Sequence, residues 1–284
     1  MKQVLNLFKL RIGVAIAFAA AAGLVVEGGS GPGTGAAAVL VLAVLFASAA
    51  AGAFNQYAER DLDARMGRTR NRPFVTGRLR HGPFWLWVIG AMLGASVLAA
   101  AVATNVLAAA YVFLGAFTYG VVYTVWLKRR TWWNIVVGGL AGSFAVLAGA
   151  AAVSPAPGPE AAWLAVVLFL WTPPHFWSLA IVCREDYAAA GVPMLPVVVG
   201  DARAARVIFA SALLLVAASL VPAAFGLGWI YAAFAAAGGG FFLLRCRALV
   251  RHPTRLAARA AFLASLAQLG AVLAGAMLDA ALLT

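Results

Sequence analysis

Residues 35–73 read GAAAVLVLAVLFASAAAGAFNQYAERDLDARMGRTRNRP, an apolar run that ends abruptly in a charged segment. The run is long enough to cross a bilayer as a helix, which takes roughly 17 to 25 residues. The charged segment, residues 55–73, holds three of the nine acidic residues of the chain beside five arginines. The stretch therefore predicts a membrane helix that carries a polar site at the membrane edge.

The rest of the chain has the composition of an integral membrane protein. Of its 284 residues, 64% are hydrophobic and 11% are charged, which excludes a water-soluble domain of this size. Apolar runs predict nine transmembrane helices in one all-α bundle that makes residues 1–284 a single domain. The predicted spans are 12–26, 35–56, 83–103, 105–126, 133–153, 160–182, 205–225, 228–244 and 260–280.

The 21 Lys and Arg residues all fall in connections on one side of this predicted bundle. By the positive-inside rule this side is cytoplasmic, with the N-terminus inside and the C-terminus outside a multi-pass cytoplasmic membrane protein. The net charge of +12 then reports topology, an anionic ligand and contact with anionic membrane lipids, and not nucleic acid. Function is expected in the cytoplasmic connections, at about 57–82, 127–132 and 183–204.

The first cytoplasmic connection carries a candidate metal site. On a continuous helix Asn55, Glu59 and Asp63 share one face, and their oxygens suit Mg²⁺, with phosphate and water completing its shell. Asp61 falls on the opposite side, where it is placed to orient an arginine. The alternative is a solvated loop whose charges pair with one another.

A second segment, which leads into a cytoplasmic connection, contains His175 and Asp186, eleven residues apart. On a regular helix they lie three turns and about 16 Å apart on one face, with Asp186 at the mouth and His175 inside the bilayer. An ionisable side chain at that depth is a functional candidate. The alternative is a neutral histidine bonded to a backbone carbonyl that Pro173 or Pro174 leaves free.

Three adjacent cations, Lys128, Arg129 and Arg130, follow the fourth predicted helix. They could bind a diphosphate, and a plain topology signal would look the same. The two long connections are four helices apart, which indicates that helices one to four and five to eight are parallel copies of one unit. Cys183 and Cys246 have no metal-ligand spacing and are interpreted as packing residues.

Together these segments resemble the UbiA superfamily of intramembrane prenyltransferases and, within it, the branch that farnesylates haem. Glu59 stands where the superfamily usually has aspartate. Only Glu185 and Asp186 stand where its aromatic-ring enzymes carry a second aspartate-rich motif, which favours the haem branch. The resemblance covers nearly the whole chain and rests on Asn55 to Pro73, Lys128 to Asn134 with Gly138 and Gly139, Pro174 to Trp177, and Asp186 to Pro196.

The resemblance implies that farnesyl diphosphate, haem B and water give haem O and diphosphate, for haem–copper oxidase biogenesis. It also implies protein partners such as a haem A synthase or oxidase assembly factors. His175 would position water, take its proton or ligate haem iron. The implied residues are Asn55, Glu59, Asp63 and Asp186 for Mg²⁺; Asp63, Asp186 and His175 for catalysis; Arg68, Arg72, Lys128 and Arg129 for diphosphate; and Tyr123, Phe176 and Trp177 for the prenyl chain or haem.

Other functions compete with this interpretation. A transporter for an anionic lipid explains the basic mouth but does not need three oxygen ligands on one face. A haem-binding electron carrier would want two deep histidines, and the other two, His81 and His252, fall in cytoplasmic connections. A quinone-pathway prenyltransferase is the alternative within the enzyme class, and the missing second aspartate-rich motif weighs against it.

Overall fold

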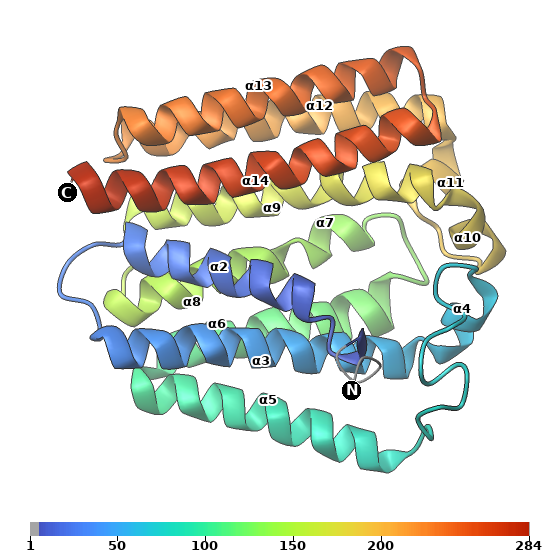
Figure 1. The fold of residues 1–284 in the computed structure, drawn as a ribbon, viewed down its shortest axis with the longest axis horizontal. Helices are drawn as coiled ribbons and strands as arrows, with labels where there is room; N and C mark the ends of the chain where they lie inside the picture. The colour runs from blue at the N-terminus through green and yellow to red at the C-terminus, as the bar shows by residue number, and fades with distance from the viewer. Residues whose placement is uncertain (1–5, 284) are drawn as a thin grey trace.

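The computed structural model describes residues 6–283 as helices joined by loops (Figure 1). Lys2, one of the cations used to predict topology, lies outside the described residues. The helices are α2 (Leu10–Val26), α3 (Thr34–Ala58), α4 (Arg60–Arg65), α5 (Pro83–Ala103), α6 (Val106–Phe117), η1 (Thr118–Leu127), α7 (Asn134–Gly138), α8 (Leu140–Val153), α9 (Pro159–Val182), α10 (Arg184–Ala189), α11 (Leu195–Val199), α12 (Asp201–Leu220), η2 (Val221–Ala224), α13 (Trp229–Arg251) and α14 (Arg255–Leu283).

Within the described residues, eight helices are long and apolar enough to cross a membrane. The first predicted span corresponds to α2, an apolar helix of 17 residues that falls short of that length. The predicted all-α membrane bundle is confirmed, and the count of nine spans stays a prediction. Helices α13 and α14 run further than their apolar cores because arginines can extend their charged heads to the interface while their stems remain against apolar surface.

Helices α2 and α8 pack closely against each other inside the bundle. A Cβ atom added to Gly149 would lie 1.9 Å from the Ala20 carbonyl oxygen, and one added to Gly23 would lie 2.1 Å from that of Val146. Small residues let membrane helices approach in this way, and van der Waals packing then stabilises the pair. The contact through Gly23 and Gly149 holds α2 against α8 in the middle of the chain.

The two ends of the bundle differ. In Figure 1 the short helices α4, α10 and α11 gather at one end, while the opposite end has the connections from α2 to α3, α5 to α6 and α8 to α9. The basic connections predicted to be cytoplasmic lie at the end with the short helices. The polar residues singled out in the sequence therefore belong to one mouth of the bundle.

Both long connections begin with the same break. The helix α3 ends before Glu59 (φ −101°, ψ 16°), and α9 ends before Cys183 (φ −105°, ψ 23°); a six-residue helix follows each. The prediction of one regular helix from His175 to Asp186 is therefore wrong, because Cys183 leaves the helical conformation between them. The same break interrupts the predicted helix from Asn55 to Asp63.

Candidate active site

Asn55, Glu59 and Asp63 line up inside the mouth despite the break at Glu59. The Glu59 N–H donates to the Asn55 carbonyl (3.0 Å) and the Asp63 N–H donates to the Glu59 carbonyl (2.8 Å), so the helical phase continues across the break. The three side chains are at most 2% exposed. The predicted row of oxygen ligands on one face is present, and it is buried.

Each member of this row contacts a cation. The Lys128 ammonium donates to Glu59 Oε2 at 2.6 Å, and Arg72 NH1 donates to both carboxylate oxygens of Asp63 at 2.7 and 2.8 Å. Lys9 Nζ donates to Asn55 Oδ1 at 2.6 Å. Burial raises the pKa of the Asp63 carboxyl against the opposing effect of Arg72. Burial also lowers the pKa of the Lys128 ammonium, against the opposing effect of Glu59.

Lys9 is the site residue that sequence reasoning missed, because it had counted only as a topology signal. It has φ 47° and ψ 43°, a left-handed conformation that is uncommon for a residue with a side chain. Its ammonium also donates to the Tyr119 hydroxyl at 2.9 Å. Desolvation, assisted by nearby Arg72, lowers the pKa of Lys9 to about 7. The left-handed backbone and the buried ammonium make Lys9 a candidate contact for an anionic ligand.

The π-helix η1 supplies the opposite wall. In its wider turns the Lys128 N–H donates to the carbonyl of Tyr123, five residues earlier. The Asn55 side-chain amide donates to Thr124 Oγ1 at 3.0 Å, and Lys128 Nζ lies 5.6 Å from the centre of the Tyr123 ring. Runs of π-helix are rare and often occur at functional sites. The sequence gives no simple signal for a π-helix, so this conformation was not predicted, although Tyr123 and Lys128 were named as site residues.

The buried row has the donor types for a hard divalent cation. Glu59 Oε1 is buried and has no hydrogen-bond partner among the described residues, so its lone pairs are available to a metal ion. Carboxylate and amide oxygens are the ligands that Mg²⁺ takes together with substrate phosphates. In residues 6–283 no three His, Cys, Asp or Glu side chains gather as a metal-binding group, so Asp186 does not join Glu59 and Asp63.

Asp186 joins the two long connections instead. Its carboxylate oxygens accept the backbone N–H groups of Gly67 and Arg68, at 2.9 and 3.3 Å. The Arg68 guanidinium also lies 5.9 Å from the centre of the Tyr187 ring. The carboxylate therefore fixes the segment that follows α4 and leads to Arg72.

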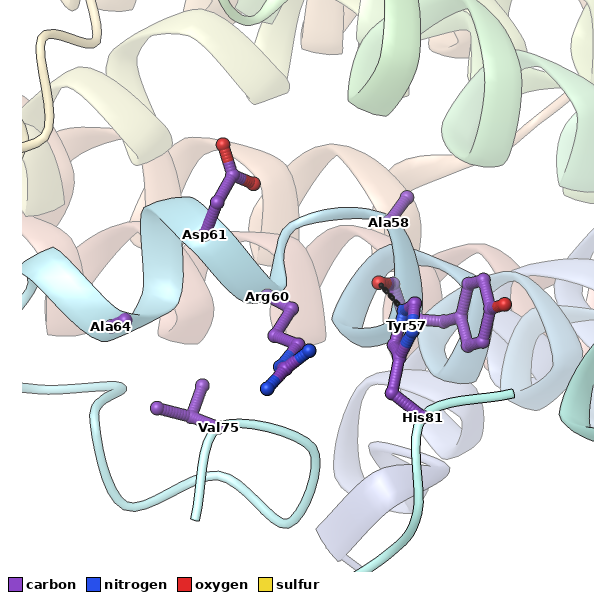
Figure 2. Close-up of a pocket in the computed structure, with 7 residues that line it drawn as sticks. All are labelled: Tyr57, Ala58, Arg60, Asp61, Ala64, Val75 and His81. Carbon is purple, nitrogen blue, oxygen red and sulfur yellow. Dashed lines mark hydrogen bonds between the residues drawn. The ribbon is translucent and has the colours of Figure 1, made fainter. Parts of the chain in front are cut away.

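Arg129 points away from the buried row. It makes a bidentate ion pair with Asp61, at 2.8 Å for each contact, and its side chain is 41% exposed. The prediction that Asp61 orients an arginine is confirmed. Beside this pair lies a cavity of about 590 Å³, into which Figure 2 shows Arg60 directed towards Val75 and His81.

His175 contacts α14 rather than a carbonyl of its own helix. Its Nδ1 lies 2.7 Å from Ser265 Oγ, so the alternative of a carbonyl freed by Pro173 or Pro174 is wrong for this nitrogen. The imidazole stacks on Trp171 and Phe262, with centroid distances of 4.0 and 4.5 Å. Two other predicted residues flank it on α9. Phe176 meets the imidazole edge-on at 5.3 Å, and Trp177 is buried with no partner for its indole N–H among the described residues.

The sequence matches the UbiA prenyltransferase family over residues 15–268. The chain belongs to the UbiA prenyltransferase family. It is 55% identical to protoheme IX farnesyltransferase 2 of Paramagnetospirillum magneticum, over 98% of this chain and 97% of that one. It is 49% identical to protoheme IX farnesyltransferase 1 of the same organism, over 74% of this chain and 75% of that one.

The fold is shared with solved members of the family. A UbiA homologue from Archaeoglobus fulgidus, bound to GPP and Mg²⁺, superposes with a TM-score of 0.71 at 18% identity. The match covers 96% of this chain and 99% of the other. The chain is thus a membrane prenyltransferase with the UbiA fold.

Proposed function

We propose that this prenyltransferase transfers a farnesyl group from farnesyl diphosphate to a vinyl group of haem B, with addition of water. The products are haem O and diphosphate, for haem–copper oxidase biogenesis. The observation that carries the proposal is the buried row Asn55, Glu59 and Asp63 with its cations, in a chain whose close relatives are named for this reaction. A quinone-pathway enzyme is the alternative within the family.

The cations stabilise the leaving group. When the allylic carbon–oxygen bond breaks, its electron pair stays on diphosphate, and negative charge accumulates there. Lys9, Lys128 and Arg72 already sit beside the row and would shift their contacts to the phosphate oxygens. Charges held in place at low dielectric act strongly on a transition state. Arg68 and Arg129 lie at the mouth, where a diphosphate would enter.

Asn55, Glu59 and Asp63 would hold Mg²⁺, which supplies Lewis-acid stabilisation of the diphosphate oxygens when it is bound. The Archaeoglobus homologue is bound to GPP and Mg²⁺, which supports a divalent metal in this family. Asp186 contributes by fixing the segment at Gly67 and Arg68. In this proposal Asp186 has a supporting role in place of the metal-ligand role expected from the sequence.

The apolar interior protects the carbocation. The farnesyl carbon that loses diphosphate bonds to one vinyl carbon, and the positive charge moves to the other, where water adds and releases a proton. Tyr123, on η1 beside Lys128, would face this path, and an aromatic face stabilises a cation by about 0.5 to 2 kcal/mol. Phe176, Trp177 and His175 would contact the haem from α9.

The mouth with the short helices faces the cytoplasm in this proposal, because the basic residues gather there. A reporter that works only outside the cytoplasmic membrane should be silent when inserted after Gly77. The same reporter fused to the C-terminus should give signal. The reverse pattern would move the active mouth to the other side. A haem A synthase or an oxidase assembly factor would accept the product.

Product analysis tests the reaction directly. Membranes that contain the chain, given haem B, farnesyl diphosphate and Mg²⁺, should yield a haem heavier by one farnesyl group and one water. Added water is diagnostic, because prenylation of an aromatic ring replaces a proton and incorporates none. A parallel reaction uses 4-hydroxybenzoate as the acceptor. Unchanged haem B beside a prenylated benzoate would assign the chain to the quinone branch.

A further inference from the structure

The imidazole of His175 is held in a defined tautomer by its neighbours. Ser265 has a single hydroxyl hydrogen, and its Oγ lies 2.7 Å from the Phe262 carbonyl oxygen, one turn earlier on α14. That hydrogen bond uses the hydrogen, so Ser265 Oγ faces His175 Nδ1 as an acceptor, at 2.7 Å. The hydrogen of a neutral imidazole must then be on Nδ1, and the lone pair is on Nε2.

Aromatic rings fix the plane of the imidazole. The ring of Trp171 stacks on the imidazole at an interplanar angle of 20°, and the ring of Phe262 stacks on it at 28°. Trp171 also donates its indole N–H to the Ser265 carbonyl at 2.8 Å, which ties α9 to α14 beside the histidine. The orientation of the ring is therefore determined by two helices and not by His175 alone.

The Nε2 atom is left for a ligand. Among the described residues, Nε2 has no hydrogen-bond partner, and the only hydrogen bond of the ring is that of Nδ1 with Ser265. The side chain as a whole is only 6% exposed. Nε2 is thus an unpartnered nitrogen on a buried ring whose other nitrogen is engaged.

The surroundings favour ligation over proton transfer. The groups that face the ring are Trp171, Phe176, Phe262 and the hydroxyl of Ser265, none of which carries a negative charge. An imidazolium formed by taking a proton would lack a counter-charge in an apolar setting, which is unfavourable. A neutral imidazole ligates a metal without acquiring a proton. Metal-bound histidines usually donate their second ring N–H to a neighbouring acceptor that sets the tautomer and raises the basicity of the ligand.

We propose that Ser265 is a positioning residue that presents His175 Nε2 as an axial ligand to the iron of the haem substrate. The inference rests on the proposed function, since it assumes that haem enters this site. Ligation would anchor the macrocycle at a fixed depth in the bundle. The end of α9 lies seven residues beyond His175, so that depth is about 10 Å from the helix end.

The test is the resonance Raman spectrum of ferrous haem B bound to the purified protein. The wild type should show an iron–histidine stretching band. His175→Gly should lose the band, and added imidazole should restore it. Ser265→Ala should keep the band at lower frequency, because the imidazole loses the acceptor at Nδ1 and becomes a weaker donor to iron.

Ser178→Ala is the matched control. Ser178 is buried on α9, one turn from His175, and its hydroxyl donates to the Pro174 carbonyl and not to the imidazole. This variant should leave the band unchanged. An unaltered spectrum in His175→Gly would exclude ligation, and an unaltered band in Ser265→Ala, or an equal shift in Ser178→Ala, would exclude the role of Ser265.

The same samples separate this inference from the proposed function. A wild type that forms farnesylated haem but gives no iron–histidine band would overturn the ligation and leave the reaction intact. A wild type that neither binds haem nor forms the product would overturn the proposed function itself.

Discussion

The two long connections at the mouth share one backbone plan and differ in chemistry. In each, a membrane helix breaks at one residue and continues as a six-residue helix, α4 after Glu59 and α10 after Cys183. Aligning the breaks places Leu179, Cys183 and Tyr187 opposite Asn55, Glu59 and Asp63. The first connection therefore carries three polar ligands where the second carries a leucine, a thiol and a phenol.

The same backbone arrangement, a break followed by a six-residue helix, therefore carries different side-chain chemistry in the two connections. A buried carboxylate is stable only when paired or bound to metal, and the first connection meets that need with Lys128 and Arg72. The second connection has apolar packing at the corresponding places, with Tyr187 buried. Its half-buried carboxylate, Asp186, reaches across to Gly67 and Arg68. We interpret the first connection as the chemical site and the second as its support.

The largest effect is expected from Asp63→Asn. The variant keeps the shape of the side chain and an oxygen that can accept from Arg72, but it loses the charge that would bind the metal. We expect a fall in kcat of about 10³-fold or more, as when a principal electrostatic contact of a transition state is removed. The measurement is turnover at saturating Mg²⁺, with folded protein verified by gel filtration. Normal turnover would remove Asp63 from the metal site.

Lys128→Met should have the next largest effect. It leaves Glu59 buried without its partner, so both thermal stability and turnover should fall, the latter by about 10²-fold. Adding Glu59→Gln should restore stability, because no buried charge is left unpaired, while turnover stays low. Arg129→Met serves as the contrast. Its pair with Asp61 is exposed and lies at the entrance, outside the buried row, so turnover at saturating farnesyl diphosphate should change by less than about threefold. Equal losses in Lys128→Met and Arg129→Met would contradict the separation of the two cations.

Asp186→Ala should have a smaller effect on the chemical step. The segment at Gly67 and Arg68 loses its acceptor, so Arg72 would be held less firmly. We expect KM for farnesyl diphosphate to rise about tenfold with a smaller change in kcat. Steady-state kinetics at varied farnesyl diphosphate give both constants. A loss of kcat as large as that of Asp63→Asn would make Asp186 a direct participant.

Much of this arrangement could be predicted from the sequence. Long apolar runs fix the membrane helices because a bilayer requires a known length, and the four-residue spacing of Asn55, Glu59 and Asp63 survives the break at Glu59. Asp61 was correctly separated from them by helical phase. These are local relations, which a sequence records directly.

The remainder depends on contacts between distant segments. Lys9 reaches Asn55 because the start of α2 packs against α3, where a Cβ atom added to Gly52 would lie 3.4 Å from Lys9 Cβ, and nothing near Lys9 in the sequence reports this. The breaks and the π-helix η1 depend on tertiary packing as well, since neither Cys183 nor residues 118–127 carry a proline or another strong local signal. Ser265 was missed because it lies 90 residues from His175.

Manganese binding tests the central claim most directly, that the first connection alone holds the metal. Mn²⁺ would be titrated by electron paramagnetic resonance into the wild type and three variants, with a farnesyl diphosphate analogue that resists ionisation. We predict one tightly bound ion in the wild type, the same ion in Asp186→Ala, and none in Asp63→Asn or Glu59→Gln. Loss of the ion in Asp186→Ala, or its retention in both Asp63→Asn and Glu59→Gln, would contradict the account.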